Sequence, residues 1–102
     1  MIPSSGSRSP WGLIATTTRW AEGILRVTPV RGGEGLWLSP ERNAQVPECL
    51  RLPTGWYSGE VEWSRVFLSF PEVFQVQNTA RITLAMYSPA VYADFTRYEA
   101  SI

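Results

Sequence analysis

The architecture of this chain follows from residues 12–38, which have the sequence GLIATTTRWAEGILRVTPVRGGEGLWL. Residues 12–18 are rich in β-branched side chains, and residues 24–30 alternate between apolar and polar ones. Glu22 and Gly23 separate the two segments and have the length of a tight hairpin loop. The pattern is typical of a β-hairpin.

A glycine-rich turn and a short strand extend this hairpin. Residues 31–35 contain three glycines, which adopt positive φ angles at little cost, so the chain is expected to reverse there. Residues 36–38 then return as a third strand, with Leu36 and Leu38 on one face and Trp37 on the other. The segment predicts a three-stranded antiparallel meander.

A two-residue loop at Glu22-Gly23 implies a definite register for the first two strands. Arg19 would then lie opposite Arg26, and because like charges in that position repel, Glu22, Glu34, a covering element or a partner should offset them. This register puts the apolar side chains on one face and the others on the opposite face. The first set is Ile14, Thr16, Thr18, Trp20, Leu25 and Val27, and the second is Thr17, Arg19, Arg26 and Thr28.

The second half of the chain carries helix signals. Ser39 is a good N-cap before Pro40, and Pro47 keeps that first helix short. Ser58 is predicted to cap a second helix. An apolar stripe at i, i+3, i+4 and i+7 supports this second helix; its members are Trp63, Val66, Phe67 and Phe70.

The C-terminal segments are predicted to be helical as well. Residues 78–88 fit both a strand and a helix, and we interpret them as a helix that Pro89 ends at Ser88. Residues 89–98 form a final short helix, in which Asp94 and Arg97 are paired three positions apart.

The predicted fold class is therefore α+β, a three-stranded antiparallel β-meander followed by three to four short α-helices packed on one face. Residues 1–10 are expected to form a flexible N-terminal arm, residues 11–98 a single domain, and residues 99–102 a C-terminal tail. The inward face of the sheet, which the apolar helix stripe covers, would carry Ile14, Trp20, Leu25, Val27, Leu36 and Leu38.

Composition excludes several function classes. The chain has 102 residues, zero net charge, no His and one Cys, and its nine basic residues are all Arg. Without His there is no Ser-His-Asp or Cys-His nucleophile and no His-ligated metal, and one Cys gives neither an internal disulfide nor a Cys-based zinc site. Zero net charge argues against an acidic nucleic-acid mimic and against a general DNA binder. We expect no catalytic residues, no metal and no cofactor.

The compartment is expected to be the cytoplasm. The first residues lack the charged start and the apolar stretch of a secretory signal, and no apolar run approaches the length that spans a bilayer.

A series of short motifs runs through the chain: SPWG at 9–12, TP at 28–29 followed by GG at 32–33, LSPERNA at 38–44, GWY at 55–57, Trp63, and FPE at 70–72. This series resembles an uncharacterised proteobacterial domain family of plasmids, integrated elements and phages. The resemblance implies an α+β domain and no defined activity. Arg31 stands where the family has a His, and Ser58 and Gly59 stand where it has an acidic pair, which lowers the expectation of an enzyme.

We expect a non-enzymatic protein–protein interaction module encoded by a mobile genetic element. Its most concrete form is an inhibitor of bacterial defence, such as an anti-CRISPR protein that binds an effector complex and blocks it sterically. The predicted contact residues are Arg19, Arg26, Arg31 and Trp37, because Arg and Trp dominate interface hot spots. The partner is a protein, without direct nucleic-acid or membrane contact, and a homodimer stays open.

Two alternatives come from other function classes. The glycine-rich turn at 31–35 could bind an anion or a small molecule through its backbone N–H groups. A carboxylate-dependent enzyme could use Glu60, Glu62 or Asp94 as acid or base. Cys49 is interpreted as an inert thiol, because the chain has no His to activate it.

Overall fold

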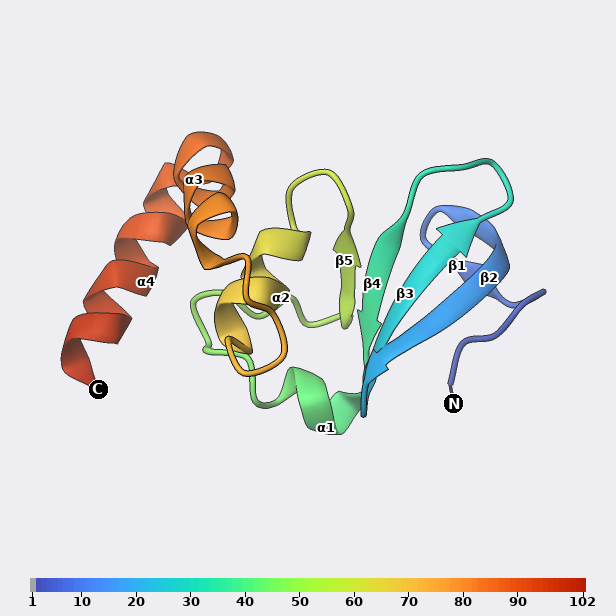
Figure 1. Ribbon diagram of the computed structural model, residues 1–102, viewed down its shortest axis with the longest axis horizontal. Helices are drawn as coiled ribbons and strands as arrows, with labels where there is room; N and C mark the ends of the chain where they lie inside the picture. The colour runs from blue at the N-terminus through green and yellow to red at the C-terminus, as the bar shows by residue number, and fades with distance from the viewer. Residues whose placement is uncertain (1) are drawn as a thin grey trace.

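The predicted meander forms the centre of the sheet in the computed structural model, which describes residues 2–102 (Figure 1). It consists of β2 (Gly12–Ala21), β3 (Ile24–Pro29) and β4 (Gly35–Leu38), paired antiparallel in chain order. Two short edge strands complete a five-stranded antiparallel sheet of order β1-β2-β3-β4-β5. These are β1 (Arg8–Ser9) and β5 (Trp56–Ser58). The fold class is α+β, with five strands rather than three.

The register of the hairpin differs from the prediction by one residue. Ala21 pairs with Ile24 across the expected two-residue loop, but Arg19 then pairs with Leu25, so that Trp20 is an extra residue in β2. Arg26 lies opposite Thr18, and the predicted pairing of Arg19 with Arg26 is wrong. The physical reason is a β-bulge, which places two residues of one strand opposite one of its neighbour.

Both faces of the sheet are buried, which corrects the prediction of a single inward face. On the helix side, Ile24, Leu36 and Leu38 join a core with residues of the helices. On the other side, a second cluster contains Ile14, Leu25, Val27 and Trp37. Because Ile24 pairs with Leu38 and Leu25 pairs with Trp37, alternation along β3 assigns Leu25 and Val27 to the face away from the helices.

The first two helices differ in how well the sequence predicts where they begin. Helix α1 (Pro40–Asn43) starts at Ser39, whose hydroxyl accepts a hydrogen bond from the Arg42 N–H. Helix α2 (Trp63–Ser69) starts later than predicted, because Ser58 ends β5 and residues 59–62 form a turn.

The last two helices confirm the helical interpretation of the C-terminal segments. Helix α3 (Gln77–Tyr87) and helix α4 (Pro89–Ser101) meet at Ser88, and an ion pair between Arg81 and Glu99 connects them. The predicted tail thus belongs largely to α4. The predicted pair of Asp94 with Arg97 is also present.

The segment predicted to form an N-terminal arm runs along β2. Its residues Arg8 and Ser9 form β1, and the backbone groups of Gly6 and Ser7 hydrogen-bond to Ile14 at 2.9 Å each. Met1, also part of the predicted arm, lies outside the described residues.

The molecule is elongated, with extents of 42 × 26 × 23 Å. Figure 1 shows the sheet at one end, α3 and α4 at the other, and α1 and α2 between them. The N-terminus and the C-terminus therefore lie at opposite ends. Within residues 2–102, none of the helices combines the length and the apolar character that crossing a membrane requires.

Candidate functional site

A row of four side chains crosses the sheet on the face away from the helices. Arg19 pairs with Leu25, Leu25 with Trp37, and Trp37 with Trp56, so one residue each from β2, β3, β4 and β5 lies in line. The rings of Trp37 and Trp56 are 6.5 Å apart between centroids. The row therefore runs from a charged end at Arg19 to an aromatic end at Trp56.

The charged half of this row borders an open groove with a volume of about 800 Å³, which we call the outer groove. Leu25 and Trp37, each only 8% exposed, form its apolar floor. Polar and charged side chains from β2, the β2–β3 turn and α1 surround this floor. These rim residues are Arg19, Glu22, Ser39, Glu41, Arg42 and Gln45, with Gly23 and Ile2 completing the lining.

One wall of the outer groove is fixed by contacts between α1 and the β2–β3 turn. The Arg42 Nε–H donates to the Glu22 carbonyl at 2.8 Å, and the Ser39 N–H donates to the Gly23 carbonyl at 2.9 Å. A Cβ on Gly23, whose φ is +76°, would lie 2.6 Å from the Ser39 Oγ, so only glycine permits this approach. The Arg42 guanidinium also lies 4.9 Å from the Phe70 ring centroid. Arg42 therefore holds the wall in place.

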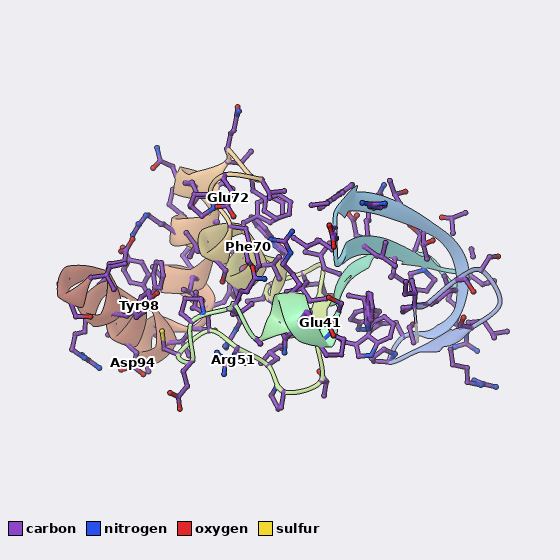
Figure 2. The ribbon with its side chains drawn as sticks, turned by 90° about the horizontal axis from the view of Figure 1, so that it is seen from below. Glu41, Arg51, Phe70, Glu72, Asp94 and Tyr98 are labelled. Carbon is purple, nitrogen blue, oxygen red and sulfur yellow. The ribbon has the colours of Figure 1, made fainter. Side chains whose placement is uncertain are left out.

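The rim of the outer groove carries unneutralised charges of both signs. Arg19 and Glu41 are both exposed, and neither forms an ion pair with any residue in the described range 2–102. Figure 2 shows Glu41 on α1 at the end nearest the sheet. An apolar floor with a polar rim has the general composition of a protein interface.

The structure brings together only two of the four predicted contact residues. Arg19 and Trp37 both line the outer groove, although Trp37 is a buried floor residue and not a protruding anchor. Arg26 points to the helix side, where its Nε lies 2.5 Å from the Glu34 Oε2. Glu34 was one of the two carboxylates expected to offset it. Arg31 is exposed at the β3–β4 turn, outside the lining of the outer groove.

The sequence reasoning missed several residues of the outer groove. Leu25 was assigned to the inward face, because the bulge at Trp20 has no signal in the local pattern. Glu41 and Arg42 belong to a helix that was predicted and Gln45 to the turn after it, but the position of this segment against the β2–β3 turn depends on contacts between distant residues.

The glycine turn is a poor anion site in this structure. Gly32 and Gly33 have φ angles of +95° and +79°, which explains the glycines as turn formers. The hollow beside them is also lined by Glu34 and Glu60, whose negative charges would repel an anion.

The three carboxylates of the enzyme alternative make separate contacts in the structure. Glu62 accepts a hydrogen bond from the Ser58 N–H at 3.0 Å, Asp94 is paired with Arg97 on α4, and Glu60 borders the hollow beside the glycine turn. Within residues 2–102, no three Cys, Asp or Glu side chains are arranged to hold a metal ion.

Two further side chains have structural explanations. Burial raises the pKa of the Cys49 thiol, which disfavours the reactive thiolate. Tyr57 is fully buried, and its hydroxyl donates to the Asn43 Oδ1 at 2.5 Å and accepts from the Leu52 N–H at 3.1 Å. Tyr57 therefore joins β5 to α1 and to the loop between them.

The comparisons with known proteins give a family assignment. Neither the curated proteins nor the solved structures contain a significant match. One family model matches residues 4–101, nearly the whole chain, and it is described as Domain of unknown function (DUF7007). An uncharacterised α+β domain family was the expectation from the motifs, and the chain belongs to the DUF7007 family.

Proposed function

We propose that this protein is a non-enzymatic protein-binding module and that the outer groove contacts its partner. The observation that carries the proposal is the row from Arg19 through Leu25 to Trp37. It joins an exposed guanidinium, which has no ion-pair partner among residues 2–102, to an apolar floor. Arg beside a buried aromatic residue is the composition in which interface hot spots are found.

The shape and charge of the outer groove favour a protein partner. The groove has a volume of about 800 Å³ and is open to solvent, and its rim carries charges of both signs at Arg19, Glu22 and Glu41. A nucleic acid would require a basic surplus to neutralise its phosphates, whereas the chain has zero net charge. A protein segment with an apolar centre and charged flanks matches this surface.

In its finer form, the proposal is an inhibitor of bacterial defence that a phage or plasmid encodes and that acts in the cytoplasm. The motif series from SPWG at 9–12 to FPE at 70–72 supports this, through its resemblance to proteins of mobile elements. An anti-CRISPR-like protein of this kind would bind one effector complex and block it sterically. Zero net charge favours occlusion over imitation of DNA.

The test is affinity capture from a related bacterium with active defence systems, followed by mass spectrometry. The tag belongs at the C-terminus, because Ile2 borders the outer groove whereas Ile102 is exposed at the other end of the molecule (Figure 1). Arg19→Glu reverses a charge on the groove, and Arg97→Glu makes the same change on α4. Figure 2 shows Asp94, the ion-pair partner of Arg97, at the end far from the sheet.

We expect one stoichiometric partner that the Arg97→Glu variant retains and that Arg19→Glu binds about tenfold more weakly or worse. The purified partner should also lose target binding when the wild-type protein is added, since occlusion requires it. Equal capture by both variants would place the contact elsewhere, and a partnerless wild-type protein would contradict the proposal for the systems in that strain.

A further inference from the structure

A second, smaller cleft lies on the opposite face of the sheet, between the sheet and α2, and we call it the aromatic cleft. Its volume is about 170 Å³, the share of roughly six water molecules in the liquid, so it suits a small chemical group. Its walls are the aromatic side chains of Trp20, Trp63 and Phe67. The apolar lining is completed by Gly35, Gly59 and Leu36, and the Glu34 carboxylate borders the cleft.

The rings of Trp63 and Trp20 both meet the Phe67 ring edge-on. The Trp63 ring meets the Phe67 ring at 81° with centroids 4.8 Å apart, and the Trp20 ring meets Phe67 at 69° and 6.2 Å. Phe74 stacks on Phe67 at 4.0 Å and 9°, and Trp20 also contacts Phe74 edge-on. The walls are therefore held by packing before any ligand arrives. Trp20, although part of this cluster, is still 40% exposed.

One carboxylate, which is paired with an arginine, lines the aromatic cleft. Glu34 is the one charged residue that lines it within the described chain. The Gly59 N–H donates to the Glu34 carbonyl at 3.0 Å, which fixes the Glu34 backbone at the cleft. One carboxylate oxygen of Glu34 accepts from the Arg26 Nε, and the side chain is 48% exposed, so the other oxygen is available to a ligand.

We propose that the aromatic cleft binds a methylated ammonium group. A cation is attracted to the faces of aromatic rings, and an alkylated cation loses little hydration when it enters an apolar box. The Glu34 carboxylate adds a second favourable term, because it lies beside the site that the cation would occupy. The group is carried by a free small molecule or by a trimethyllysine side chain, and the chemistry at the cleft is the same for both.

Substitutions of Arg26 and of Glu34 should change the affinity for a cation in opposite directions, which tests this proposal. Its guanidinium is bound to Glu34 beside the aromatic cleft, so it competes with an incoming cation for the same carboxylate. Removal of this competing charge in Arg26→Gln should strengthen cation binding, whereas Glu34→Gln should weaken it. A purely apolar pocket would respond to neither substitution in this way.

The experiment measures binding of choline, of its uncharged isostere 3,3-dimethylbutanol, and of a short peptide with one trimethyllysine. Calorimetry gives the affinities, and the indole N–H signals of Trp20 and Trp63 in NMR spectra report the site. We expect the charged ligand to bind about tenfold or more tightly than the isostere. Choline binding assigns a free small molecule as the source, and binding of the peptide alone assigns a side chain.

Variants separate a cleft effect from a folding effect. Trp20→Ala should reduce affinity about tenfold or more, and Tyr87→Ala, which changes an exposed aromatic residue on α3, should leave it unchanged. Far-UV circular dichroism verifies that each variant is folded. Equal binding of choline and the isostere, no binding of either cation, or an unaltered affinity in Trp20→Ala would overturn the proposal. The outcome is independent of the partner capture at the outer groove, which lies on the other face.

Discussion

Replacing Tyr57 by Phe removes one hydroxyl from a buried junction of three segments. That hydroxyl donates to the Asn43 Oδ1 and accepts from the Leu52 N–H, and the Asn43 Nδ2 in turn donates to the Leu52 carbonyl at 2.9 Å. In the variant, the Asn43 Oδ1 and the Leu52 N–H lose their partner in a place that water does not reach, since Tyr57 is 0% and Asn43 8% exposed. Each orphaned group costs about 1–3 kcal/mol.

The total loss for Tyr57→Phe is therefore about 2–6 kcal/mol, and each kcal/mol lowers Tm by roughly 4–8 °C for a domain of this size. Urea and thermal unfolding followed by circular dichroism measure it. Tyr87→Phe is the matched control, because Tyr87 is 64% exposed and its change should stay within about 0.5 kcal/mol. A Tyr57→Phe variant as stable as this control would refute the reasoning, because the junction would then contribute nothing to the fold.

Three further predictions follow from burial and packing. Burial raises the pKa of Tyr57 above its usual value near 10, so the contribution of the Tyr57 hydroxyl to the free energy of unfolding is complete below pH 10 and is lost as the pH rises further. Above pH 10, the urea midpoint should therefore fall more for the wild type than for Tyr57→Phe. Burial likewise raises the pKa of Cys49, so its thiol should react with a disulfide reagent more slowly than glutathione does, and the difference should disappear in denaturing urea. A Cβ on Gly35 would overlap the Trp11 ring, so Gly35→Ala should lower the free energy of unfolding by about 1–3 kcal/mol; an unchanged urea midpoint would contradict that packing.

The start of α1 and the boundary between α3 and α4 were predictable because their signals are local. Ser39 and Pro40 mark the start of α1 within two residues, and Pro89 both ends α3 and begins α4. Start and stop residues act through their own backbone geometry, so no knowledge of distant contacts is needed. In the ambiguous segment at 78–88, only the end of the helix has such a signal, because α3 has no side-chain cap at its start.

The sheet was predictable in outline and not in detail. The loop at Glu22-Gly23 is correct, since Ala21 pairs with Ile24 as expected. The bulge beside it is not a property of the local pattern, because an extra residue in β2 is stabilised by what it contacts in α2. The three residues of β5 are likewise too few to form a strand pattern, and they pair with β4 across 17 intervening residues from Leu38 to Trp56.

For the candidate site too, what depends on the local sequence pattern was predicted correctly, and what depends on the strand register was not. The prediction that Arg19 and Trp37 share a face is correct, because it depends on alternation along strands. The placement of Arg26 on that face was wrong, because it depended on the pairing of Arg19 with Arg26 that the bulge prevents. The extra residue in β2 therefore leaves Arg19 and Trp37 on the face away from the helices, while Arg26 lies on the opposite face.

That same residue connects the two proposed sites. In a regular strand, neighbours alternate between faces, but the bulge lets Trp20 and Ala21 both pack against the helix side. Arg19 is left on the outer face opposite Leu25, where it borders the outer groove. In the regular register, Trp20 would lie opposite Leu25 and Arg19 would face the helices. The aromatic cleft would then lose a wall, and the outer groove would lose the Arg19 guanidinium. Both proposed binding surfaces thus depend on one extra residue in β2.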